Sequence, residues 1–290
     1  MTTMLNLVDA MQIKYAAAKR LQRVALIFAL LILVAGSLAR IPALSAWAGW
    51  IAAAVFGLQI LAFILRQVAS DFAGEGEEIR RMAMLQDGLG VVPPKCRVAQ
   101  VRLSIHGKKN SEPAYIGPYY DSDLPIGPQR LIDITTECAF FTAGNTRYFA
   151  NIIGCVVLVG AVLTVLAFVG FVSSSDDVKT IHDVSKVFIA SMVFWVTGEA
   201  VGMYRTLHGV AGACDKILET GERQLEQPAD PQSDTTTATA LFADYNAAVV
   251  KSPLIPAWIY SLRRDSMNEV WLARKHPPTT HEPPVADNAS

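Results

Sequence analysis

Charged side chains are scarce in this chain of 290 residues. Only 18% of its residues are Asp, Glu, Lys or Arg, against about 25% in soluble domains, and 52% are hydrophobic. The charges are also absent from four long stretches. This shortage excludes an ordinary soluble enzyme and a disordered regulator, and it predicts an integral membrane protein.

Cysteine clusters and catalytic motifs are missing as well. The four cysteines form no C-x-x-C pair, so we expect neither a disulfide framework nor a zinc site. The five histidines show no H-E-x-x-H spacing, and no G-x-S-x-G motif is present. Arg102 stands where a phosphate-binding loop ending in Gly107-Lys108 would need glycine. We therefore expect no enzyme, no metal and no cofactor.

Four apolar stretches are long enough to cross a bilayer as helices. They cover Leu21–Ala39, Leu44–Leu65, about Asn151–Val172 and about Val184–Tyr204. At 1.5 Å per residue, the shortest reaches about 28 Å, close to the thickness of a hydrocarbon core. Small residues end the first stretch, as before a signal-peptide cleavage site, but a second span follows after only four residues. We therefore expect a retained helical hairpin.

The basic residues give the direction of insertion. Of the 25 Lys and Arg, all but Arg40, Lys179 and Lys186 lie before the first span or at its start, between the second and third, or after the fourth. Because basic residues stay on the cytoplasmic side, both termini and the central segment are expected in the cytoplasm. The chain is then expected to be a multi-pass membrane protein.

The predicted fold class is an all-α integral membrane protein with two transmembrane hairpins, cytoplasmic helical extensions and a small irregular cap. Its parts are an amphipathic helix (1–20), the first hairpin (21–65), a cytoplasmic central domain (66–150), the second hairpin (151–204), C-terminal cytoplasmic helices (205–275) and a disordered tail (276–290). We expect the amphipathic helix to lie on the anionic inner leaflet, with a gating role as the alternative.

Within the cytoplasmic parts, the second span is expected to continue as a helix to Leu89, with a break or bend near Gly74 and Gly76. Residues 95–105 alternate polar and apolar, which predicts a half-exposed strand. Helices are expected at 129–148, 205–227, 236–250 and 255–275, with a polar linker at 228–235. The last helix either packs on the cytoplasmic helices or lies on the membrane surface.

The cap, Val91–Pro128, combines basic and aromatic side chains. Such a surface can stack a base and neutralise phosphate, whereas the alternative is a tyrosine-supported loop with solvated lysines. The candidate ligand-binding residues are Arg97, Arg102, Lys108, Lys109, Tyr115, Tyr119 and Tyr120.

One ionisable residue lies inside the fourth span. Glu199 is five residues from Tyr204, and a carboxyl group at that depth faces a bundle interior or a wet cavity. It is either a pore-lining or proton-responsive carboxylate, or a neutral group with a hydrogen-bond partner. Gln59 of the second span has a similar depth and is a candidate partner. Gly198 and Gly202 form a G-x-x-x-G motif, which favours close helix packing.

Several short motifs resemble those of a known family. They are the Tyr15–Gln22 run before the first span, Glu78-Ile79-Arg80-Arg81 after the second, and Tyr119-Tyr120 before the return helix. With the two hairpins, they resemble the bacterial four-transmembrane pore-forming effectors of cyclic-nucleotide antiphage signalling. The resemblance implies a dormant multi-pass protein of the bacterial inner membrane that homo-oligomerises when a partner nucleotidyltransferase makes a cyclic nucleotide. The assembly would then breach the lipid membrane and abort the infection.

Two other functions remain open from the residues alone. The chain could be a small ion or proton channel or transporter that uses Glu199, or a non-catalytic membrane scaffold. No feature indicates binding to a nucleic acid polymer.

Overall fold

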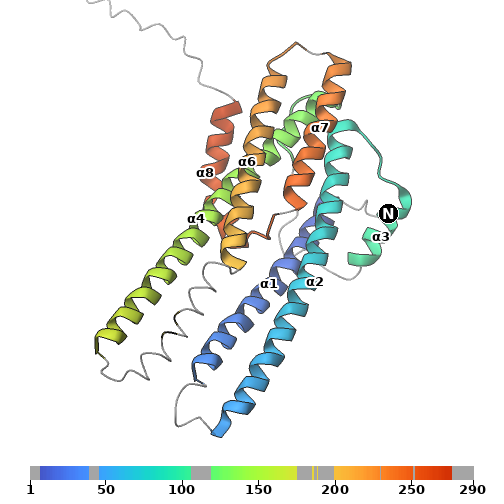
Figure 1. The fold of residues 1–290 in the computed structure, drawn as a ribbon. Helices are drawn as coiled ribbons and strands as arrows, with labels where there is room; N and C mark the ends of the chain where they lie inside the picture. The colour runs from blue at the N-terminus through green and yellow to red at the C-terminus, as the bar shows by residue number, and fades with distance from the viewer. Residues whose placement is uncertain are drawn as a thin grey trace, which may run out of the picture. The chain divides into compact units, whose positions relative to one another are not determined.

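The computed structural model describes residues 7–38, 46–105, 119–174, 185, 188, 199–228, 230–250 and 252–275 (Figure 1). Every regular element of more than one turn in these ranges is an α-helix, which confirms the all-α prediction. The helices are α1 (Leu7–Leu38), α2 (Ala48–Leu89), α3 (Lys95–Ile105), α4 (Pro128–Ser174), α6 (Glu199–Leu225), α7 (Pro231–Val250) and α8 (Ala257–Lys275).

Two helices of the described part are long and apolar enough to cross a membrane. They are residues 49–89 of α2 and residues 128–170 of α4. Almost none of their apolar windows is buried within the chain, as Phe56, Phe63 and Leu158 illustrate with more than 60% exposure. A soluble core helix would bury these side chains, so the outward-facing surface is that of a membrane protein. The first predicted span belongs to α1, and most of the fourth lies outside the described residues.

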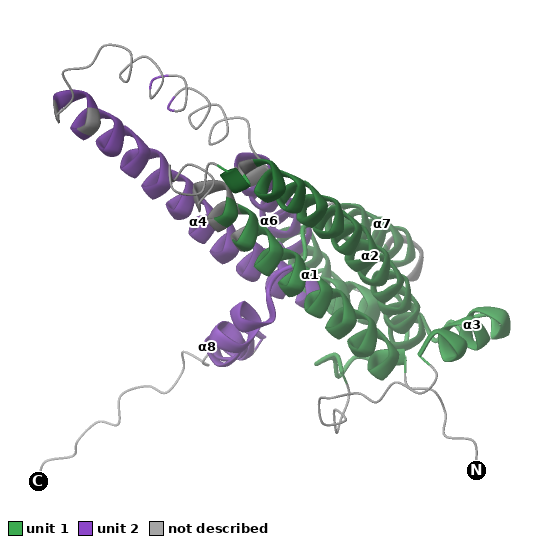
Figure 2. Ribbon diagram, turned by 90° about the horizontal axis from the view of Figure 1, so that it is seen from below, with its two compact units in different colours: residues 1–136, 219–254 green, residues 137–218, 255–290 purple. Residues whose placement is uncertain are grey.

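The chain divides into two compact units (Figure 2). Unit 1 comprises residues 1–136 and 219–254, and unit 2 comprises residues 137–218 and 255–290. The boundaries fall within α4 and α6, so each of these helices contributes one part to each unit.

In unit 1, α1 and α2 pack side by side over much of their lengths (Figure 1). Small residues recur in α2 at every seventh position of the buried seam, as Ala62, Ala69, Gly76 and Ala83. In α1, Ala18 and Ala25 keep the same spacing. In a left-handed helix pair, residues that recur every seven positions stay on the side that faces the partner helix. Small side chains at these positions let the two backbones approach closely.

The predicted continuation of the second span as a helix to Leu89 is confirmed, but the helix has no break near Gly74 and Gly76. α2 runs without interruption and ends at Gly90, whose φ of 69° is left-handed. The Gly90 N–H donates to the carbonyl of Gln86 (3.1 Å). At about 1.5 Å per residue, the 42 residues of α2 reach roughly twice the thickness of the hydrocarbon core of a bilayer.

The strand predicted at residues 95–105 is wrong, because this segment is helix α3. The carbonyl of Pro94 accepts hydrogen bonds from the amides of Arg97 and Val98, which starts the helix. Val101 and Ile105 then pack on the same apolar cluster as α1 and α2. The predicted linker at 228–235 is also too long, because α7 already begins at Pro231.

In unit 2, α8 packs on α4. Of the two predicted arrangements, this is the one in which the last helix packs on other helices of the chain. Ile255 and Ile259 form a buried cluster with Phe149, Ala150 and Leu207. Farther along α8, the Trp271 ring lies 5.3 Å from that of Phe140.

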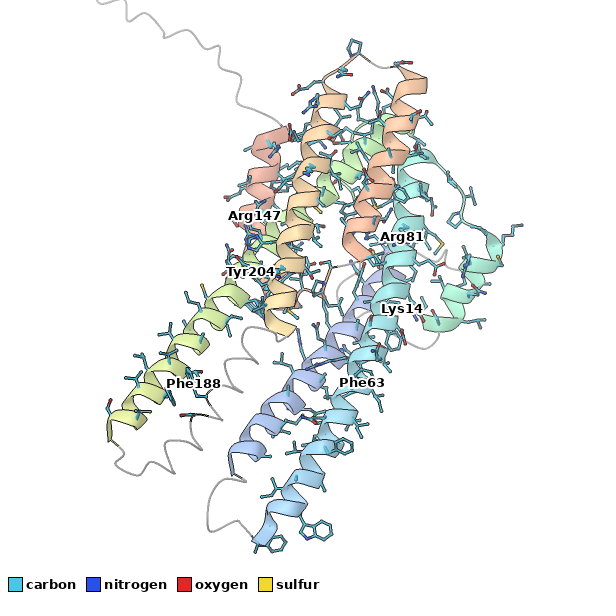
Figure 3. The ribbon with its side chains drawn as sticks, viewed as in Figure 1. Lys14, Phe63, Arg81, Arg147, Phe188 and Tyr204 are labelled. Carbon is cyan, nitrogen blue, oxygen red and sulfur yellow. The ribbon has the colours of Figure 1, made fainter. Side chains whose placement is uncertain are left out.

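Unit 2 also contains a described part of the fourth predicted span. Phe188 stacks on Phe168 of α4, with ring centroids 4.2 Å apart (Figure 3). At the other end, Tyr204 of α6 lies against Gly154, where an added Cβ would come within 3.0 Å of the tyrosine ring. Phe188 and Tyr204 therefore both lie against α4.

Candidate functional site

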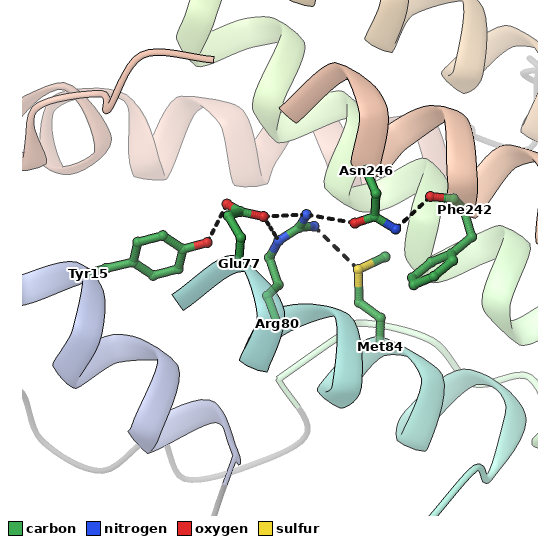
Figure 4. Close-up of polar contacts among 6 residues, drawn as sticks. All are labelled: Tyr15, Glu77, Arg80, Met84, Phe242 and Asn246. Carbon is green, nitrogen blue, oxygen red and sulfur yellow. Dashed lines mark hydrogen bonds and ion pairs between the residues drawn. The ribbon is translucent and has the colours of Figure 1, made fainter. Parts of the chain in front are cut away.

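A buried polar network in unit 1 joins α1, α2 and α7 (Figure 4). Its centre is Arg80 of α2, which is only 7% exposed. The Arg80 guanidinium donates from Nε to Glu77 Oε2 (2.8 Å) and from Nη2 to Asn246 Oδ1 (3.1 Å). Its Nη1 faces the Met84 sulfur at 3.3 Å. The Tyr15 hydroxyl of α1 donates to the other Glu77 oxygen.

The α7 side of the network is held in place by further contacts. The Asn246 amide donates to the carbonyl of Phe242 (2.7 Å), which orients its oxygen toward Arg80. The Tyr245 ring lies under the Arg80 guanidinium at 4.6 Å, in cation–π geometry. Since Tyr245 and Asn246 are both less than 10% exposed, the arginine is enclosed by α7 as well as by α2.

The Tyr15 phenol stays protonated. Burial, and then the neighbouring Glu77 carboxylate, raises the pKa of Tyr15 far above its ordinary value near 10. The hydroxyl is therefore a permanent donor to Glu77 at physiological pH. This hydrogen bond links α1 to α2.

The amphipathic N-terminal helix contributes to this core, so its predicted position on the lipid surface is wrong for the described part. Lys14 is 2% exposed, forms an ion pair with Glu75, and lies 5.1 Å from the Phe72 ring (Figure 3). Leu7, Ala10 and Met11 pack with Ile79 in one apolar cluster. The reason is that α2 continues beyond the membrane and offers a protein surface to the apolar side of α1.

A second polar centre in unit 1 anchors the segment before α4. Arg130 donates from Nη1 to the carbonyls of Ser122 (2.8 Å) and Leu124 (2.7 Å). Its Nε and Nη2 donate to the backbone and carboxylate of Asp87. These bonds use the planar fork of arginine to fold the segment onto the end of α2.

The predicted ligand-binding residues have different surroundings. Arg97 and Arg102 are exposed on α3, where Arg97 lies 3.4 Å from a Glu78 oxygen. Tyr119 is 39% exposed, but Tyr120 is 3% exposed and packs edge-on against it at 4.9 Å. The Tyr120 ring is thus part of the core and presents no face to a ligand. Lys108, Lys109 and Tyr115 lie outside the described residues.

The polar residues predicted within the spans are only partly described. Gln59 is exposed on α2. Glu199 is the first residue of α6, and its side chain, like Gly198, lies outside the described part. At Gly202, an added Cβ would meet no atom within 4 Å, so the close approach of α6 to α4 is seen at Gly154 instead.

Sequence reasoning missed both polar centres. Arg130 entered the sequence analysis only as a positive charge, Arg80 as a charge and as part of the Glu78-Ile79-Arg80-Arg81 motif, and Glu77 had no predicted role. The one available signal was that the Tyr15 run and the Arg80 element both carry the family resemblance. Among the described residues, no group of three or more His, Cys, Asp or Glu could hold a metal ion.

Comparison with known proteins gives one match. The family model described as SMODS-associating 4TM effector domain matches residues 1–273. No curated protein and no solved structure matches the chain.

Proposed function

The chain belongs to the family of SMODS-associating 4TM effector domains, and on that premise we propose that it is a pore-forming or membrane-disrupting effector of antiphage defence. In this proposal, four spans cross the bacterial inner membrane and both termini face the cytoplasm. The family description links the chain to a nucleotidyltransferase signalling partner. A nucleotide made by that partner would open the membrane and abort the infection.

The observation that carries the proposal is the continuity of α2. The same unbroken helix contains Phe56 and Phe63, which face outward in the apolar span, and Glu77 and Arg80, which are bound to α1 and α7. Since a helix transmits rotation and translation along its axis, a change in the cytoplasmic network moves the span. A sensor and a membrane opening can thereby be coupled within one unit.

Assembly of several copies is part of the proposal, because four helices are too few to surround a wide pore. Gln59 is the only residue with a polar amide between Ala48 and Leu65, and its side chain is exposed instead of packed on α1. An amide facing hydrocarbon is costly unless it finds a partner. A neighbouring copy or the pore water would satisfy it.

We propose that the sensor is the surface around α3 and the segment that follows it. Arg97, Arg102, Lys108 and Lys109 supply positive charge for phosphates, and Tyr115 and Tyr119 supply rings for a base. Tyr120 supports Tyr119 edge-on and does not itself contact the ligand in this proposal.

The test uses the full chain in bacteria that carry a membrane-potential dye, with the partner nucleotidyltransferase supplied on an inducible plasmid. Induction should depolarise cells that contain the wild-type protein. The variant Lys108→Glu/Lys109→Glu should abolish the response. Lys216→Glu, an exposed basic residue of α6, is the matched control and should leave the response intact. Unchanged polarisation in wild-type cells would favour a scaffold over a pore.

A further inference from the structure

The segment from Ser252 to Leu262, which leads from α7 into α8, contains no charge. From Ser252 to Leu262 the sequence is SPLIPAWIYSL, with Lys251 before it and Arg263-Arg264 after it. An uncharged segment with aromatic residues and basic flanks is typical of the boundary between lipid and water. The family assignment gives this segment no role.

The contacts within unit 2 place the start of α8 at the depth where α4 enters the membrane. Ile255 and Ile259 pack on Phe149 and Ala150. The last charge of α4 before its apolar stretch is Arg147, which forms an ion pair with Asp215. From Tyr148 to Ser174, α4 has no further charge. Residues 149–150 are therefore at the cytoplasmic boundary of the hydrocarbon core, and so is the first turn of α8.

A contact within unit 1 gives the same depth independently. The Gln22 amide of α1 donates to the carbonyl of Leu254 (3.4 Å). Gln22 stands at the start of the first predicted span, one residue after Leu21. The residue that directly precedes Ile255 is thus also at a membrane entry.

At this depth, large apolar side chains of α8 point away from α4. Trp258 is 50% exposed and Leu262 is 63% exposed, and the two lie one turn apart on the same side of the helix. Their direction is fixed, because Ile259 is fully buried and Arg263 donates to the carbonyl of Gly144 while lying 5.1 Å from the Tyr148 ring. In water, this pair would be an uncovered apolar patch.

We propose that residues 255–262 are an interfacial membrane anchor, with Trp258 and Leu262 inserted between the lipid headgroups of the inner leaflet. Lipid is the occupant because the flanking contacts hold both side chains at headgroup depth. An indole is favoured there, since its ring enters the apolar layer while its N–H reaches water or headgroups. The anchor holds α8 at the membrane surface. Because Met267 and Trp271 of α8 lie against α4, it also holds the cytoplasmic part of α4 there.

The test measures depth by electron paramagnetic resonance in the full chain in liposomes. Each variant carries one nitroxide on one cysteine, with the other native cysteines replaced by alanine. The labelled positions are Trp258→Cys, Leu262→Cys, Asn268→Cys and the native Cys155, all of them exposed in the structure. Collision with oxygen, which concentrates in lipid, is compared with collision with a water-soluble nickel chelate.

Labels at 258 and 262 should prefer oxygen. The label at 268 is the matched control, because it is about 9 Å farther along the same helix and should prefer nickel. Tryptophan fluorescence gives a second measurement. Trp258→Phe keeps an apolar ring but removes the indole from the headgroup layer, so lipids brominated near the headgroup should quench less of the tryptophan fluorescence.

Cys155, inside the apolar stretch of α4, separates this inference from the proposed function, which rests on the same spans. If 155 prefers oxygen but 258 and 262 behave like 268, the segment lies in water and the anchor is refuted. If 258 and 262 are shielded from both reagents, protein covers them, which also refutes it. A nickel preference at 155 would refute the spans themselves and the proposed function with them.

Discussion

Replacing Arg80 by methionine should destabilise the protein more than replacing any exposed arginine. The variant Arg80→Met keeps an unbranched apolar stem but removes the charge, the bonds to Glu77 and Asn246, and the contact with Tyr245. Breaking a buried pair from one side costs about 3–5 kcal/mol, because the remaining charge is left uncompensated. The Glu77 side chain is 18% exposed and can take up some water, so we expect about 3 kcal/mol.

The assay is thermal unfolding of the detergent-solubilised full chain, followed by helical circular dichroism. A loss of about 3 kcal/mol corresponds to a melting temperature lower by roughly 6–12 °C in a chain of this size. The double variant Glu77→Gln/Arg80→Met should cost less than the sum of the single variants, because the uncompensated charge is then gone.

The neighbouring ion pair provides the control. Arg97 and Glu78 lie 3.4 Å apart, but their side chains are 55% and 49% exposed. An exposed pair contributes at most about 1 kcal/mol, so Arg97→Met should hardly change the melting temperature. If Arg80→Met proved as mild as Arg97→Met, the network would not hold α1, α2 and α7 together.

Three further predictions follow from the described contacts. Gly88→Ala should destabilise the folded protein, because the added Cβ would come within 3.0 Å of the Leu131 backbone. Gly74→Ala, where the added Cβ meets no neighbour, should stabilise the protein by about 0.5–1 kcal/mol. Thermal unfolding of the two variants checks both predictions. The pKa of Tyr15 is higher in the folded than in the unfolded chain. The contribution of its hydroxyl to the free energy of unfolding should therefore be complete below about pH 10. It should decrease as the pH rises above 10, because the unfolded chain then loses the proton first. The difference between wild type and Tyr15→Phe, measured by urea unfolding, should therefore stay constant from pH 7 to 9 and shrink above pH 10. Arg130→Lys should lower amide-exchange protection just before α4, because an ammonium cannot reproduce the fork of bonds.

The helices that leave the membrane could be predicted from the sequence. No proline interrupts the chain between Arg66 and Leu89, and glycines at 88 and 90 precede two prolines. The structure ends α2 there, with Gly90 in the left-handed region. These are local signals, and local physics decides where a helix can continue and where it must end.

Segment 95–105 shows where a short pattern is ambiguous. Its alternation fits a strand, but Val98, Val101 and Ile105 also recur at helical spacing. A lone strand would leave its backbone groups without a neighbouring ladder, whereas a helix satisfies them internally. The apolar cluster on α1 and α2, which the segment itself does not reveal, selects the helix.

Long-range partners explain the remaining errors. Lys14 reads as a surface lysine because Glu75, its partner, is far away in the sequence. Gly76 reads as a helix breaker, but it leaves room for the Tyr15 ring, to which an added Cβ would come within 3.2 Å. The buried network was missed for the same reason. Its polar side chains belong to α1, α2 and α7, which are far apart in the sequence and meet only in the folded chain.

The strength of this network suits the proposed dormancy. A pore that is closed in about 99% of molecules needs a free-energy difference of about 2.7 kcal/mol. The contacts of Arg80 with α7 are of that order, with about 1.5–3 kcal/mol for the charged hydrogen bond to Asn246 and about 0.5–2 kcal/mol for the cation–π contact with Tyr245. To reverse such a population, a ligand must bind the open form about 10⁴-fold more tightly, or by about 5.5 kcal/mol. If opening separates Arg80 from α7, Arg80→Met alone removes most of the closed-state advantage. Expression of that variant should then slow growth without any nucleotide signal, whereas Arg97→Met should not. Normal growth with Arg80→Met, at wild-type protein levels, would mean that this network persists when the pore opens.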